Sequence, residues 1–353
     1  MESIKQFLKR KDIVFSARRY GIDALGAMAQ GLFASLLVGT ILGTLGSQLG
    51  WDILVKIGDF AKAVDGVAMA VAIGYALHCP PLVLFSLCSV GYAADALGGA
   101  GGPLAVLLVT CVAAECGKAV SKETPVDILV TPLTTIIVGS LLSIGCAPYI
   151  GMAASSVGNA IMWATELHPF LMGILVSVMV GIALTLPISS AAICAALGLT
   201  GLAGGAAVAG CCAQMIGFAV ISFRENKWSG LLSQGLGTSM LQMGNIVRNP
   251  RIWIAPTLAS AITGPLATCL FKLQMNGAPV SSGMGTCGLV GQIGVYTGWV
   301  DDIAAGTKDA ITAMDWIGLI LICFVLPALL SLAFDFIVRK LGWVKDGDMK
   351  LDV

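Results

Sequence analysis

FLMGILVSVMVGIALTL, residues 170–186, carries no charged side chain and is followed at once by Pro187-Ile188-Ser189-Ser190. In a bilayer every backbone N–H and C=O needs a partner within the protein, so a spanning segment is either an α-helix or a strand of a closed barrel. Barrel strands alternate apolar and polar residues, whereas this run is continuously apolar. The stretch therefore predicts a membrane helix that ends at a proline inside a region that is still apolar.

The composition extends this prediction to the whole chain. Of its 353 residues, 57% are hydrophobic and only 11% are charged, and the mean hydropathy is +0.91. A soluble domain is about 25% charged, so this chain has too little charge to cover a surface that faces water. Further spans are expected at Gly21–Leu49, Pro103–Ala119, Asp127–Tyr149, Leu202–Phe223, Ile252–Leu273 and Trp316–Val338. We predict an all-α, polytopic membrane protein.

A second proline-serine break resembles the first. Pro279-Val280-Ser281-Ser282 begins 92 residues after Pro187, and each break follows an apolar span and precedes a Cys and a Gly-Leu step. We interpret this as an internal repeat, in inverted orientation, with two re-entrant or broken helices. Interrupted segments at corresponding positions of two repeats indicate the binding site of a transporter, so we expect the two breaks to approach each other.

Basic residues gather at the two ends of the chain. Of 20 Lys and Arg residues, six lie in residues 1–20 and four in residues 339–350. Positive charge favours the cytoplasmic side of the membrane, which predicts cytoplasmic termini and an even number of crossings. Residues 1–20 lack the apolar core of a signal peptide and are expected to lie on the inner leaflet. The predicted parts are a basic arm (1–20), an N-terminal helical bundle (21–150), a repeat-bearing core (151–341) and a cytoplasmic tail (342–353).

Cysteine and histidine usage points away from disulfides and metal chemistry. Most of the eleven cysteines lie in apolar segments, where a reduced thiol behaves as a small hydrophobe, and none forms a Cys-x-x-Cys pair. With two histidines in the chain and no recognisable nucleophile–base triad, we expect no metal ion, no cofactor and no catalytic residues.

Two motifs carry a family resemblance, Lys122-Glu123-Thr124-Pro125-Val126-Asp127-Ile128-Leu129-Val130-Thr131-Pro132 and Leu186-Pro187-Ile188-Ser189-Ser190-Ala191-Ala192-Ile193. From about Ile13 to Leu341 the chain resembles the stand-alone IIC-type membrane proteins of the phosphotransferase system, the perfringolysin-regulator-like group. The resemblance implies about ten membrane helices, a sugar-like substrate at the bilayer midplane, a homodimer and a multi-pass location in a bacterial inner (plasma) membrane.

The chain also departs from that pattern. Sugar-specific IIC permeases often carry a Gly-Ile-Thr-Glu loop, whereas this chain has Ala164-Thr165-Glu166-Leu167-His168-Pro169. No IIA or IIB domain and no phosphorylated cysteine loop of the IIB type is legible. We therefore expect a permease component without its own phosphorylation site, with separate IIA and IIB proteins as partners if transport is coupled to phosphorylation.

Polar side chains within the apolar regions are the candidate ligand contacts. An ionisable group inside a span costs on the order of 3 kcal/mol unless it is paired, so such groups are functional candidates. The candidate substrate-binding residues are Glu166, His168, Asn159, Ser189, Ser190, Ser281, Ser282, Glu115 and His78.

Each candidate also has a purely structural interpretation. Glu166 can be solvated in an outer loop, and Glu115 can pair with Lys118 or Lys122. The prolines that precede the serine pairs can open short helices, in which case the serines cap those helices. His78 lies just before a Pro-Pro pair and can donate a hydrogen bond to the carbonyl groups freed at a helix break.

Three functions remain open from the sequence. The first is a membrane permease for a small polar, sugar-like metabolite. The second is a membrane-bound sensor or regulator that binds a ligand without moving it. The third is an ion-coupled transporter of an organic anion, held by the N-termini of the half-helices.

The charge distribution makes a prediction about topology. Reporter enzymes fused to either end of the full chain should be active on the cytoplasmic side only, because both ends are rich in Lys and Arg. Paired reporters for the cytoplasm and the outside provide the control. A signal from outside at either end contradicts the assignment.

Overall fold

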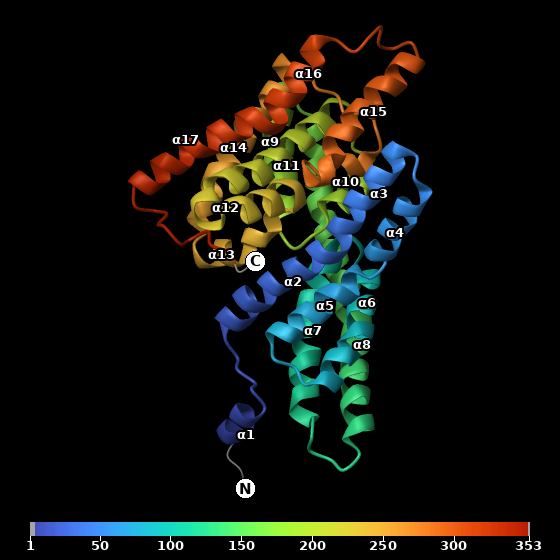
Figure 1. The fold of residues 1–353 in the computed structure, drawn as a ribbon, viewed down its shortest axis with the longest axis vertical. Coiled ribbons are helices and arrows are strands. Elements are labelled where there is room, and N and C mark those ends of the chain that lie inside the picture. The colour runs from blue at the N-terminus through green and yellow to red at the C-terminus, as the bar shows by residue number, and fades with distance from the viewer. Residues whose placement is uncertain (1–3, 352–353) are drawn as a thin grey trace. The chain divides into compact units, whose positions relative to one another are not determined.

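The computed structural model of the chain (Figure 1) describes residues 4–351. The regular elements in this range are helices, and the β contact is an isolated bridge between Gly201 and Met275. Six helical segments are long and apolar enough to cross a membrane, and two shorter apolar helices accompany them. The all-α, polytopic architecture is thereby confirmed, while the expected count of about ten crossings stays a prediction.

The chain forms two compact units, residues 1–154 and 155–353. The helices that begin in the first unit are α1 (Ile4–Arg10), η1 (Arg19–Ala24), α2 (Leu25–Leu32), η2 (Phe33–Leu37), α3 (Val38–Leu49), α4 (Asp52–Lys62), α5 (Asp65–Ala76), α6 (Pro81–Gly98), η3 (Gly99–Gly101), α7 (Gly102–Val120) and α8 (Asp127–Thr165). Helix α8 continues from the first unit into the second.

A glycine turn shapes the first unit. The chain is helical from Pro81 to Val120, but η3 reverses its direction so that α6 and α7 pack against each other and α5 packs on both. Gly99 in this turn has φ 52°, a left-handed conformation that glycine adopts with little steric cost. The glycine-rich stretch 98–102 thus forms the turn between α6 and α7.

The helices of the second unit are α9 (Pro169–Thr185), α10 (Ser190–Ala196), α11 (Gly201–Ile221), α12 (Phe223–Leu232), α13 (Met243–Arg248), α14 (Ile254–Pro265), α15 (Val290–Ala304), α16 (Ala313–Ile320) and α17 (Leu326–Lys340). Short turns η4 (Ser233–Gly237), η5 (Ser239–Gln242), η6 (Pro250–Trp253), η7 (Leu266–Leu270), η8 (Pro279–Gly283), η9 (Cys287–Leu289) and η10 (Leu321–Val325) connect or extend them.

Helices α9, α11 and α14 pack pairwise at the centre of the second unit (Figure 1). The Ser177 hydroxyl of α9 donates to the Ser260 carbonyl of α14 over 2.8 Å. Such contacts require close backbones, which small residues permit. Helix α17 covers α11 and α14.

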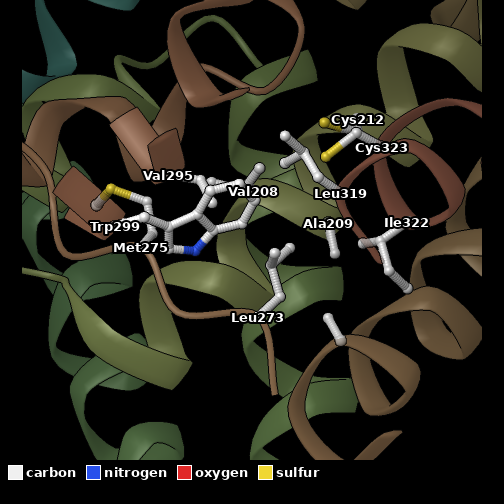
Figure 2. Packing of buried hydrophobic residues seen from close by; sticks show 11 residues of the cluster. Val208, Ala209, Cys212, Leu273, Met275, Val295, Trp299, Leu319, Ile322 and Cys323 are labelled. Carbon is white, nitrogen blue, oxygen red and sulfur yellow. The ribbon is translucent and has the colours of Figure 1, made fainter. Parts of the chain in front are cut away.

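A buried apolar cluster joins α11 to the segments that follow α14 (Figure 2). The indole of Trp299 on α15 lies among Val208, Met275 and Val295. Trp299 is 4% exposed. This packing fixes the chain on both sides of the second proline-serine break.

The tail of the chain is held against the second unit through its backbone. The Asn226 side chain donates to the Met349 carbonyl and accepts from the Leu351 N–H, each over 2.8 Å. Gln242 donates to the same Met349 carbonyl, and Asn245 donates to that of Lys350. Residues 352 and 353 lie outside the described part of the chain.

Asp335 and Arg339, one turn apart on α17, form an ion pair at 2.7 Å. Arg339 extends it into a network, because the same guanidinium also reaches Glu225 on α12 and Asp346 in the tail.

Candidate functional site

The first break interrupts the chain between α9 and α10. Helix α9 ends at Thr185, and Pro187 lies in the turn that follows. The Ser189 hydroxyl then accepts a hydrogen bond from the Ala192 N–H over 3.1 Å. Ser189 is thus the N-cap of α10, which is the role that its position after a proline allows.

The second break is more extended. After η7 the chain runs without helix through residues 271–278 and then enters the single turn η8. Within this segment Met275 exchanges two backbone hydrogen bonds with Gly201, of 2.9 and 3.0 Å. Gly201 begins α11, so the approach to the second break is tied to the exit from the first.

The two breaks hold each other by reciprocal hydrogen bonds. The Ser190 hydroxyl donates to the Gly283 carbonyl over 2.7 Å, and the Ser282 hydroxyl donates to the Leu199 carbonyl over 2.6 Å. Ser190 and Ser282 occupy the same place in their motifs, and both side chains are buried. The predicted approach of the two breaks is confirmed. Both hydroxyls are engaged within the protein. Ligand contact by these serines is not tested by this geometry and stays a prediction.

The first serine of each pair has a different environment. Ser189 is half-buried and caps its own helix. Ser281 is buried against Gly294 of α15, where a Cβ would lie 2.5 Å from the Ser281 Cβ. The absent side chain at Gly294 therefore allows α15 to pack directly on the second break.

A cavity of about 520 Å³ lies beside the second break. Its walls come from residues 271–276, from α15, from the turn that follows α15 and from α16. Trp299, whose ring belongs to the apolar cluster, also lines the cavity. The volume is within the range of roughly 300–1,000 Å³ that is usual for small-molecule sites.

The polar groups of this cavity are positioned by hydrogen bonds. The Asn276 amide donates to Asp302 over 2.7 Å, and the Thr307 hydroxyl donates to the Asp302 carbonyl over 3.0 Å. Lys308 donates to Asp315 over 2.9 Å. These groups present amide and carboxylate oxygens that accept, and amide and ammonium N–H groups that donate.

The backbone at the mouth of the second break is strained. Lys272, which also lines the cavity, has φ 46°. A residue with a Cβ pays of the order of 1 kcal/mol or more for this left-handed conformation. Such strain clusters at functional sites, where the surrounding structure enforces it.

Three candidates from the sequence lie on the surface of the second unit. Glu166 and His168 are exposed in the turn between α8 and α9, and Asn159 is exposed near the end of α8. None of the three lines the cavity beside the second break. Their proposed contact with a ligand is not tested by this geometry and stays a prediction.

The other two candidates belong to the first unit. Glu115 is buried on α7, where it pairs with Lys118 at 3.0 Å and accepts from the Tyr20 hydroxyl over 3.0 Å. The pairing with Lys118 was one of the two expected for Glu115. The exposed His78 ring lies 3.2 Å from Asp12. In both cases the contacts are internal to the protein.

The sequence interpretation missed the residues that shape the cavity. Asn276, Trp299 and Asp302 lie in or after the Gly- and Ser-rich stretch of the second break, but only the fold brings them together. The signal that was present is the position of Asn276 three residues before Pro279, within a break already identified.

The sequence also gave no prominence to Gln214, which is fully buried in the middle of α11. Its amide donates to Thr257 and Ser260, and its carbonyl oxygen accepts from the Trp253 indole over 2.9 Å. These contacts satisfy both ends of the amide. Gln214 therefore joins α11 to η6 and α14.

Apolar helices of membrane-spanning length, with two broken segments locked together beside a polar cavity, define a polytopic membrane protein of the transporter class. Comparison with protein families matches residues 22–351 to the family described as "Phosphotransferase system, EIIC". The chain belongs to that family, the sugar-type membrane permease components of the phosphotransferase system. Comparisons with curated proteins and with solved structures find no significant match.

The contact between the breaks makes a prediction about stability. A Cβ at Gly283 would lie 2.5 Å from the Ser190 carbonyl oxygen, so Gly283→Ala must push the two breaks apart. We expect a loss of about 1–3 kcal/mol, measured as a lower thermal midpoint of the detergent-solubilised protein. Gly145→Ala on α8 is the matched control, since a Cβ there meets nothing within 4 Å. Equal midpoints for the two variants contradict the contact.

Proposed function

We propose that the cavity beside the second break is the sugar-binding site of this permease component. The observation that carries the proposal is its composition: an aromatic wall at Trp299 and hydrogen-bonding groups at Gln274, Asn276 and Asp302 share one cavity. A sugar has apolar C–H faces and a ring of hydroxyls, so it needs both kinds of surface.

The charge balance of the cavity favours a neutral ligand. Lys272 and Lys308 face it together with Asp302 and Asp315. Lys308 is neutralised by Asp315 at 2.9 Å, so the lining holds as many carboxylates as ammonium groups. An organic anion would need an excess of positive charge, and this lining supplies none. The balance supports a neutral polyol over the anionic substrate that the sequence left open.

The position of the cavity supports transport over simple binding. Its wall at residues 271–276 is continuous with the second break. Within that break Ser282 donates to the Leu199 carbonyl, and the Gly283 carbonyl accepts from Ser190. A change in ligand contact at Asn276 or Lys272 would therefore shift the second break against the first. We call the contact between the two breaks, with its two hydrogen bonds, the joint between the repeats. In this proposal, movement of that joint opens the cavity alternately to the two sides of the membrane. Separate IIA and IIB proteins would phosphorylate the released sugar, and the homodimer stays a prediction.

Asp302 provides the test. We expect Asp302→Asn to lower the initial rate of sugar uptake at least tenfold, because hydrogen bonds to a charged acceptor are worth about 1.5–3 kcal/mol. Asp301→Asn is the matched control, since Asp301 is exposed and does not line the cavity. The measurement is uptake of radiolabelled hexoses, hexitols and pentoses by the full chain in liposomes, with and without phosphorylated IIA and IIB proteins.

The alternatives give different results in the same assay. If Asp302→Asn transports as fast as the unaltered chain, the cavity is not the binding site. If sugars raise the thermal midpoint but never enter the liposomes under any condition, the protein is a ligand sensor. Uptake that requires an imposed ion gradient, and that is unaffected by the donor proteins, indicates ion-coupled transport.

A further inference from the structure

A second hollow region lies in the first unit, where the N-terminal arm meets α7. Its larger part is an apolar groove of about 660 Å³. Phe7 and Leu8 of α1 form one side, and Leu108 and Val112 of α7 form the other. The proposed sugar site does not involve these residues, so this region needs its own explanation.

The polar groups within the groove are turned toward each other. Tyr20 and Glu115 both line it, and the Tyr20 hydroxyl donates to the Glu115 carboxylate over 3.0 Å. Glu115 is in turn paired with Lys118. The remaining surface of the groove is apolar, which suits a hydrocarbon chain.

A basic pocket of about 280 Å³ is lined by residues from the same two segments, the arm and the end of α7. Arg10, Lys11, Lys118 and Lys122 line it, together with one carboxylate, Asp12. The two compartments share α1 and α7 as walls. Phe7 of the groove also lies beneath the basic residues, with its ring centre 5.4 Å from the Arg10 guanidinium and 5.9 Å from the Lys11 ammonium.

Each carboxylate near this pocket offsets a basic group: Glu123 pairs with Arg10 and Lys11, Glu115 with Lys118, and Asp12 with Arg19. Among the described residues, Lys122 is the cation of the pocket that forms no ion pair, so the pocket keeps a small excess of positive charge. Both Asp12 oxygens accept from Arg19, over 3.1 and 2.6 Å. This pair lowers the pKa of Asp12 to about 2, so Asp12 stays ionised as the counter-charge of Arg19. Glu123 is held by Arg10 and Lys11, and Asp127 accepts from the Lys122 backbone N–H.

The cations are held in place by the fold. The Lys118 ammonium is buried and donates to the carbonyls of Asp12 and Leu77 over 2.6 and 3.0 Å. Lys11 donates to the Ser121 carbonyl. Because Lys118 holds the Asp12 segment against the end of α7, the pocket keeps its shape without a ligand.

We propose that the arm and α7 together form a binding site for one anionic phospholipid, with the negatively charged headgroup in the basic pocket and an acyl chain in the apolar groove. A phospholipid joins a hydrocarbon chain to an anion, which matches an apolar groove and a basic pocket that are both built on the arm and α7. A free phosphate would occupy the basic pocket only and leave the groove empty. The arm is therefore an intrinsic part of a lipid site, beyond a general attraction to the inner leaflet.

The test uses the full chain purified in detergent and native mass spectrometry with two lipids, dioleoyl phosphatidylglycerol and dioleoyl phosphatidylcholine. We expect the anionic lipid to be retained preferentially. Arg10→Gln with Lys122→Gln should weaken its retention about thirtyfold, since each basic side chain near a membrane surface contributes about 1 kcal/mol. The matched control is Lys340→Gln with Lys345→Gln, two exposed basic residues at the end of α17 and in the tail.

A second variant addresses the groove. Val112→Trp should fill it and reduce retention of the anionic lipid while the basic pocket stays intact. Leu141→Trp, at an exposed position of α8, is the matched control. Unchanged thermal midpoints and elution volumes show that the variants fold.

Three outcomes would overturn the proposal. The first is equal retention of the two lipids. The second is equal loss in the Arg10/Lys122 pair and the Lys340/Lys345 pair. The third is stabilisation by inorganic phosphate that matches stabilisation by the anionic lipid and is insensitive to Val112→Trp, which would assign the pocket to free phosphate.

Discussion

The second unit depends on a single constraint, which is that backbone groups freed by a helix break find no partner in lipid. Each break leaves carbonyl groups without a helical N–H donor. A serine hydroxyl of the other repeat supplies the missing donor. The Ser190 hydroxyl donates to the Gly283 carbonyl, and the Ser282 hydroxyl donates to the Leu199 carbonyl. Neither break can be buried without its counterpart. The pairwise packing of α9, α11 and α14 matters because it brings the two breaks into register.

The polar groups of this unit fall into two kinds, and the difference indicates where function resides. Gln214 is enclosed on all sides, and protein atoms satisfy both ends of its amide. Asn276 and Asp302 are also fixed by hydrogen bonds, yet they face a cavity. The first kind joins helices, whereas the second presents fixed donors and acceptors to whatever enters. Fixed groups of that kind lose little conformational entropy when a ligand binds.

The sequence predicted those features that depend on local chemistry. Continuous apolar runs without charge require helices. Pro187 and Pro279 each remove a helical hydrogen bond and each precede two serines, which favours a break, so the spans and the two breaks were legible. Glu115 was expected to pair with Lys118 or Lys122, and it pairs with Lys118, which lies three residues away on the same helix face.

The cavity was not predictable in the same way. Its lining comes from separate segments whose sequence shows no shared repeat, and only the tertiary fold brings them together. These residues include Asn276, Trp299, Lys308 and Asp315. The sequence drew attention instead to Glu166 and His168, because they adjoin a proline. An ionisable residue beside a break is as compatible with an exposed turn as with a site, and the exposed turn is where the structure has them.

The attachment of the tail has a consequence for how the sequence can vary. Asn226, Gln242 and Asn245 bind main-chain atoms of Met349, Lys350 and Leu351. Every residue type offers the carbonyls, and every type except proline offers the N–H. The side chain at an exposed position such as Lys350 can therefore change without loss of the hydrogen bond. The length of the tail cannot drift in the same way. A chain that stopped before Met349 would leave amides of the second unit, including the fully buried Gln242, short of partners. Each such amide would cost about 1–3 kcal/mol. Among relatives, spacing from α17 should therefore vary less than residue identity.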